Sequence, residues 1–128
     1  MKAFTDIQQS KKLAEILPLE SADCYWDYDE MQKFHRISWF EDGYNKESQL
    51  MLNENNVCAW SLAALLSVIP KHIKDYNVLR IDISENDFAI WYDEIGYGVN
   101  NDLPNITMEF AVDACAEMVL KLYELKIL

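Results

Sequence analysis

The side chains best suited to nucleophilic chemistry are the thiol of Cys58 and the imidazoles of His35 and His72. Cys58 directly precedes a predicted helix, whose backbone N–H groups would favour the thiolate, and a histidine beside it could act as the base. Nothing in the sequence places either histidine near Cys58, and a small buried core residue is the commoner role of such a cysteine. We therefore predict no catalytic residue. An enzyme or small-ligand binder that uses Cys58 stays open as an alternative.

The sequence indicates neither a metal site nor a cofactor site. Residues 82–93 carry oxygen ligands at the spacing of a calcium-binding loop, but Asp87 stands where such a loop requires glycine. The histidines have no cysteine or histidine at metal-ligand spacing, and there is no C-x-x-C pair. Residues 96–98 lack the later glycine, the lysine and the following helix of a phosphate-binding loop. We predict no metal and no cofactor.

The charge balance restricts the class of partner. The chain has 11 Lys and Arg against 22 Asp and Glu, which gives a formal net charge of −11. Nucleic-acid backbones and anionic membranes select basic surfaces, so neither is expected as a partner. The N-terminus lacks the apolar stretch of a secretory signal, and three widely spaced cysteines are typical of free thiols, which predicts a cytoplasmic protein. The length suits a single domain over residues 1–128.

The most apolar stretch of the chain is residues 59–69, which Pro70 closes. Because this stretch has no continuous polar stripe, it predicts a helix that is buried on most sides. Leu65 and Leu66 lie on its bulky face, and both are expected to be almost fully buried. Small side chains form a ridge on which a second helix could pack closely, and they are Ala59, Ala63 and Ser67.

Hydrophobic periodicity on both sides of this stretch predicts two further helices and two hairpins. The helices cover residues 6–17, with Thr5 as N-cap of a capping box that Gln8 completes, and residues 109–125. The hairpins pair residues 24–28 with 34–40 and residues 78–84 with 88–95, with Leu79, Ile81 and Ile83 pointing inward. The predicted fold class is α+β. Its two layers are an antiparallel sheet of two hairpins and three helices, in the order α-ββ-α-ββ-α.

Aromatic residues gather on the strands of both predicted hairpins and on the loop that follows the second one. They are Trp26, Trp39, Trp91, Tyr25, Tyr28, Tyr92 and Tyr97. If alternate residues of one strand face the helices, Trp91 and Asp93 must fall on the opposite, open side of the sheet. Exposed aromatic residues beside acids are typical of protein-recognition surfaces. The candidate partner surface comprises Trp91, Asp93, Glu94, Tyr97 and Asp87. The alternative is that these rings pack against one another or against a second copy of the chain.

The second predicted hairpin, the loop after it and the start of the last predicted helix are strongly acidic. No Lys or Arg occurs between Arg80 and Lys121, whereas nine acids do: Asp82, Glu85, Asp87, Asp93, Glu94, Asp102, Glu109, Asp113 and Glu117. A negative surface formed by these residues would steer a basic partner toward the protein. The alternative is that the charge serves only solubility.

The chain resembles a family of small uncharacterised proteins from gut anaerobic bacteria and their mobile elements. Three blocks carry the resemblance: FTDIQQSKKLAEILPLESAD (residues 4–23), CAWSLAALLSVIP (58–70) and VDACAEMVLKLYELKIL (112–128). The chain departs from the family pattern at Ala59, which separates Cys58 from Trp60, and at Phe110-Ala111, where the family has Asn-Pro. Both departures can shift the start of a helix. The family has no assigned activity, so the resemblance implies a shared fold and no catalytic residue.

These observations favour a non-enzymatic, protein-binding accessory or regulatory protein of a mobile element. A first alternative is an acidic inhibitor of the immunity-protein or DNA-mimic kind, which would occupy a basic site on its target. The second alternative is the small-ligand binder or thiol enzyme that uses Cys58. We expect a basic protein as partner, with no nucleic acid and no membrane, and no feature of the sequence indicates a homo-oligomer.

Overall fold

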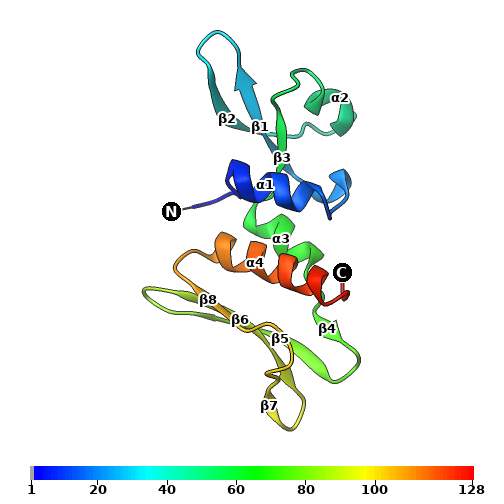
Figure 1. Ribbon diagram of the computed structural model, residues 1–128, viewed down its shortest axis with the longest axis vertical. Coiled ribbons are helices and arrows are strands. Elements are labelled where there is room, and N and C mark those ends of the chain that lie inside the picture. Colours follow the sequence, from blue (N-terminus) through cyan, green and yellow to red (C-terminus); the bar gives the residue numbers. More distant parts are fainter. Residues whose placement is uncertain (1) are drawn as a thin grey trace. The chain divides into compact units, whose positions relative to one another are not determined.

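The computed structural model describes residues 2–128 and combines helices with antiparallel strands, which confirms the predicted α+β class (Figure 1). The order of helix, hairpin, helix, hairpin and helix is followed, with short additional elements between them. The chain divides into two compact units: an N-terminal unit of Ala3–Ala64, and a C-terminal unit of Leu65–Leu128 together with Lys2. The single domain expected over residues 1–128 stays a prediction.

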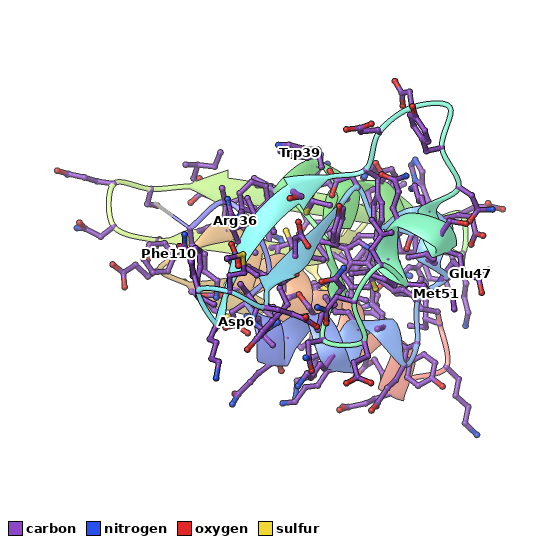
Figure 2. All side chains as sticks on the ribbon, turned by 90° about the horizontal axis from the view of Figure 1, so that it is seen from above. Asp6, Arg36, Trp39, Glu47, Met51 and Phe110 are labelled. Atoms are coloured by element: carbon purple, nitrogen blue, oxygen red, sulfur yellow. The ribbon has the colours of Figure 1, made fainter. Side chains whose placement is uncertain are left out.

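The N-terminal unit consists of a three-stranded antiparallel sheet and short helices. The first predicted hairpin is present as β1 (Cys24–Asp29) and β2 (Phe34–Trp39), and β3 (Val57–Ala59) pairs with the other edge of β1. Helix α1 (Ile7–Ala14) packs against β3. A 3-10 turn, η1 (Leu19–Ser21), and a short helix, α2 (Lys46–Leu50), complete the unit. Figure 2 shows Trp39 at the end of β2 and Met51 just after α2.

The first helix begins one residue later than the predicted capping box requires. Asp6, and not Thr5, is the N-cap: its carboxylate accepts the Gln9 N–H at 2.8 Å, and the Gln9 side-chain oxygen accepts the Asp6 N–H at 3.0 Å. The predicted pair of Thr5 and Gln8 is therefore wrong by one position. The motif itself, an oxygen-bearing N-cap with a glutamine three residues on, is the one expected.

Thr5 has a different role, because it is fully buried. Its hydroxyl accepts the Trp60 N–H at 3.1 Å and lies 2.7 Å from the Ser10 hydroxyl. Its own N–H donates to the Trp60 carbonyl at 3.0 Å, and its carbonyl accepts the indole N–H of Trp26 at 2.9 Å. These bonds tie the chain before α1 to the chain after β3, and they satisfy polar groups that would be costly to bury unpaired.

The predicted central helix over residues 59–69 is shorter than expected. Ala59 belongs to β3, and helix α3 covers only Leu62–Val68. The shift has a local cause in Ser61, whose N–H donates to the Asp23 carboxylate at 3.0 Å and whose hydroxyl donates to the same carboxylate. The Ser61 hydroxyl oxygen also accepts the Ala64 N–H at 3.2 Å, which is the bond of a helix N-cap. The helix therefore starts directly after Ser61.

Burial along α3 corrects part of the predicted packing. Leu65 is fully buried, as expected, but Leu66 is only half-buried. Ala63 and Ser67 are exposed, so the small-residue ridge does not pack under a second helix. Because the helix begins later, the buried stripe runs through Ala64, Leu65 and Ile69.

The C-terminal unit consists of a five-stranded antiparallel sheet with one long helix. The second predicted hairpin is present as β5 (Asn77–Ile83) and β6 (Phe88–Glu94). Strand β4 (His72–Ile73) pairs with β5, while β7 (Gly98–Val99) and β8 (Ile106–Met108) both pair with β6. The two predicted hairpins therefore lie in two different sheets and not in one. Strand β3 completes the first sheet, and β4, β7 and β8 complete the second.

Helix α4 (Ala111–Glu124) covers one face of this sheet (Figure 1). It packs mainly on β6 and β8, so Phe88, Ile90 and Tyr92 of β6 are buried. On β5, Ile81 and Ile83 were expected to point inward, yet they are 40% and 77% exposed. Helix α4 leaves the second half of β5 uncovered. No helix within residues 2–128 has both the length and the apolar character to cross a membrane.

Candidate functional site

The face of the five-stranded sheet opposite α4 carries the principal candidate residues. In β6, the buried side chains Phe88, Ile90 and Tyr92 alternate with Trp91 and Asp93. Because successive side chains of a strand point to opposite faces, Trp91 and Asp93 lie on the face away from α4, as predicted. Both are half-buried and not fully exposed. No helix of the C-terminal unit covers this face (Figure 1).

Trp91, Asp93 and Arg80 form one bonded group on this face, here named the Trp91 cluster. The Trp91 indole N–H donates to Asp93 Oδ1 at 2.8 Å, and Arg80 Nε donates to Asp93 Oδ2 at 3.2 Å. Arg80 is the direct register partner of Trp91 across β5 and β6. Sequence reasoning missed Arg80, although strand alternation already placed it on the outer face. What the sequence lacked was the register that sets it beside Trp91.

The remaining predicted site residues lie apart from this cluster. Glu94 is half-buried and opposes Asn77, one position out of phase with Asp93. Tyr97 is 84% exposed in the turn after β6, where its N–H donates to the Glu94 carbonyl at 2.9 Å. Asp87 precedes the opposite end of β6. It is about 20 Å from Asp93 at the usual rise per residue of a strand. The structure therefore brings Trp91 and Asp93 together, puts Glu94 and Tyr97 at one end of the sheet, and leaves Asp87 at the other end.

A shallow groove of about 410 Å³ lies along the outer edge of β5, near the end of the short strand β4. Its lining is mainly apolar and comprises Leu66, Lys71, His72, Val78, Leu79 and Ile81. Lys71 is tied down, since its ammonium donates to the Leu66 carbonyl. The groove was not predicted, because it joins residues from α3, β4 and β5 whose proximity depends on tertiary structure.

The nine acids of the acidic stretch differ in their ion pairing. Three of its nine acids are paired with cations: Asp93 with Arg80 at 3.2 Å, Asp113 with Lys2 at 2.6 Å, and Glu117 with Lys121 at 3.8 Å. The other six have no cationic partner among the described residues. Three of them, Asp82, Glu85 and Asp87, gather where β5 turns into β6, and the others are Glu94, Asp102 and Glu109.

The candidate nucleophile Cys58 does not occupy the predicted position at a helix N-terminus. It lies within β3 and is buried, and burial raises the pKa of its thiol, which therefore stays protonated at neutral pH. Its partner across the sheet is Tyr25, whereas His35 opposes Tyr28 and so points to the other face. His72 belongs to the C-terminal unit. These positions give Cys58 no histidine within its own unit that could act as a base.

Because its thiols are buried, the protein is expected to lose stability at alkaline pH. Burial raises the pKa of the Cys115 thiol to about 11, although the charge of Lys71 opposes this. Between pH 9, the ordinary pKa of a thiol, and pH 11, the unfolded chain releases the Cys115 proton while the folded chain keeps it. The contribution of this group to stability is therefore present below pH 9 and falls as the pH rises above 9. The expected slope from this group is up to about 1.4 kcal/mol per pH unit.

The measurement is urea unfolding between pH 8 and pH 10.5 under reducing conditions, with Cys115→Ala as the matched variant. The variant should lose less stability per pH unit than the natural chain. Equal slopes for the two proteins would show that Cys115 does not contribute this dependence.

No group of histidine, cysteine and acidic side chains in residues 2–128 is arranged to hold a metal ion. Comparisons with protein-family models, with curated proteins and with solved structures find no match to the chain.

Proposed function

We propose that the protein acts by binding another protein, and that the open face of the five-stranded sheet is its binding surface. The observation that carries this proposal is the Trp91 cluster, a tryptophan and an arginine fixed on a sheet face that no helix of the C-terminal unit covers. Tryptophan and arginine are the residue types most enriched among the side chains that dominate binding energy at protein interfaces.

The geometry of the cluster favours binding because its side chains are already held in place. Asp93 accepts one bond from Trp91 and one from Arg80, so both donors are fixed before any partner arrives. A side chain ordered in the free protein loses less conformational entropy on association, and more of its contact energy appears as affinity. The cluster also stands on two long paired strands, which are more rigid than a loop.

The proposed role is that of an accessory or regulatory protein in the cytoplasm. Support for the compartment comes from three thiols that are separate and buried. Support for an accessory role comes from the resemblance to proteins of mobile elements. The excess of acidic over basic residues supports a basic protein as the partner.

A second candidate function is that of an acidic inhibitor that occupies a basic site on its target. The observation that favours it is the end of β5 and the turn after it, where Asp82, Glu85 and Asp87 are exposed and have no cationic partner in the described chain. This reading needs a target whose binding weakens steeply with salt, since exposed charges are screened. The thiol-enzyme alternative has less support, because burial raises the pKa of the Cys58 thiol.

The test compares two tryptophans of the same chain. Tagged protein is used to capture partners from its native host, and each captured protein is purified and titrated against Trp91→Ala and against Trp39→Ala. Trp39 is the control from another surface, because it lies on β2 of the N-terminal unit and is 55% exposed, whereas Trp91 is half-buried on β6. A central interface tryptophan costs about 2 kcal/mol or more when truncated, so Trp91→Ala should weaken binding by about 30-fold or more.

Trp39→Ala should leave the affinity within about twofold of the natural value, because surface residues outside an interface contribute little. A partner that binds both variants equally well would contradict the proposal. A target lost on Trp39→Ala alone would move the binding surface to the N-terminal unit.

A further inference from the structure

Strand β5 has an edge that is only partly paired. On one side it pairs with β6 along its whole length, Asn77–Ile83. On the other side β4 pairs only with Asn77 and Val78, and the Leu79 N–H donates to the Lys71 carbonyl at 2.9 Å. Beyond this point, no strand within residues 2–128 pairs with the outer edge of β5.

The direction of the Leu79 bond shows which backbone groups this edge presents. The Leu79 N–H points outward, toward Lys71. Backbone direction alternates along a strand, so the N–H and C=O groups of Ile81 and Ile83 also point outward, while those of Arg80 and Asp82 point toward β6. An open row of this kind is a template for the addition of another strand.

The side chains at the same edge form an apolar strip. Ile81 and Ile83 lie on the α4 side of β5, beyond the part of the sheet that α4 covers, and Ile83 is the more exposed. Ile81 also lines the groove of about 410 Å³, together with Leu79 and Leu66. The edge therefore combines backbone groups that can pair with apolar surface that can receive alternate side chains, which are the two requirements for recognition of an extended peptide.

We propose that the edge of β5 binds an extended segment of a basic protein, which adds a strand to the sheet in line with β4. Alternate apolar side chains of the segment rest on Ile81, Ile83 and the groove, and a basic side chain between them lies opposite Asp82. This inference rests on the proposed function and specifies the mode of binding and the chemistry of the partner.

Charge complementarity selects the basic partner. Asp82 points to the same face as the Trp91 cluster, since it opposes Ala89 while Arg80 opposes Trp91. Arg80 is already neutralised by Asp93, whereas Asp82 and the neighbouring turn acids Glu85 and Asp87 have no cationic partner among the described residues. An added strand with Lys or Arg at this position forms an opposite-charge cross-strand pair, and an acidic one is repelled.

A second copy of this chain fits the edge poorly. Symmetric pairing centred on Asp82 would set two like charges directly opposite each other, which is destabilising. Pairing centred on Ile81 would place the Ile83 of the other copy opposite Leu79, a position that Lys71 occupies. Pairing centred on Ile83 would put Ile81 against Glu85 and run into the β5–β6 turn.

The test uses synthetic peptides and fluorescence anisotropy. The probe is acetyl-Lys-Val-Lys-Val-Lys-Val-amide with a fluorescent label, and a peptide of the same composition in the order Lys-Lys-Lys-Val-Val-Val is the control for charge alone. Two further probes carry N-methyl groups, one on every lysine amide and one on every valine amide. Strand addition uses only alternate amides of the peptide, so one N-methylated probe should bind like the parent and the other at least tenfold more weakly.

Charge reversal provides the second arm. Asp82→Lys should weaken binding of the lysine probe at least tenfold and should bind the corresponding glutamate probe, which the natural chain rejects. Asp102→Lys makes the same change in net charge at an exposed position outside β5, and it should leave the affinity for the lysine probe within about twofold.

Two results would overturn the edge-strand inference and leave only general charge attraction. One is equal binding of the alternating and block peptides, and the other is an equal loss of affinity for the lysine probe on Asp82→Lys and Asp102→Lys. The proposed function fails differently, through a natural partner that is indifferent to Trp91→Ala. A partner that depends on Trp91 while all peptides fail to bind would refute the strand addition and retain the open face as the binding surface.

Discussion

Replacement of Trp60 by alanine is expected to lower the free energy of unfolding by about 3–5 kcal/mol. Trp60 is fully buried, and its indole N–H donates to the Ser21 hydroxyl at 3.0 Å. Its backbone is paired in both directions with Thr5, so the neighbouring chain cannot easily close around the space that the ring leaves. Both the lost transfer energy of a large ring and the remaining cavity contribute to the cost.

Trp39→Ala is the matched control for this substitution in the same unit. The Trp39 ring is mostly exposed and makes one edge contact with Phe4, at 5.3 Å between ring centroids. An aromatic pair of this kind contributes about 0.5–1.5 kcal/mol, so the control should lose no more than that. Urea unfolding followed by circular dichroism measures both changes. A loss below about 1 kcal/mol for Trp60→Ala would mean that Trp60 is not a core residue.

Leu65→Ala is expected to cost about 2–5 kcal/mol, and Leu66→Ala clearly less. The two residues are neighbours in α3 with the same side chain, but Leu65 is fully buried whereas Leu66 is half-buried beside the groove. The change in helix propensity is the same at both positions. The difference between the two losses in the free energy of unfolding therefore reports burial alone. The sequence predicted equal burial, so this pair also separates the structure from the sequence-based expectation.

Unfolding in urea at constant pH provides the comparison of the two leucine variants. Each should unfold with the slope of the natural chain, which shows that the surface exposed on unfolding is unchanged. Equal losses at Leu65 and Leu66, or a larger loss at Leu66, would contradict the burial pattern of α3.

The longer elements of the fold were predictable because their signals are local. Strict alternation marks β5 and β6, and a continuous amphipathic period marks α4. The two- and three-residue strands β4, β7 and β8 are too short for any period to appear. The error at residues 59–61 has a tertiary cause, since the Asp23 carboxylate holds Ser61 from a distant part of the chain and shifts the helix start.

The candidate site was predictable in part. Strand alternation correctly separated Trp91 from the buried face of β6, because that argument needs only one strand. The position of Arg80 depends on the register between β5 and β6, which a single sequence does not reveal. Asp87 joined the predicted surface because it is close in sequence, but an extended strand carries it to the far end of the sheet. The open edge of β5 depends on where β4 stops, which also lies outside local sequence patterns.

The central claim is that the five-stranded sheet of the C-terminal unit binds the partner. Amide hydrogen exchange of the protein, alone and saturated with the purified partner, tests it most directly. The account predicts slowed exchange in β5 and β6, strongest at the amides of Ile81 and Ile83, which no strand in the described chain protects. Protection confined to Ala3–Ala64, with β5 and β6 exchanging as in the free protein, would contradict it.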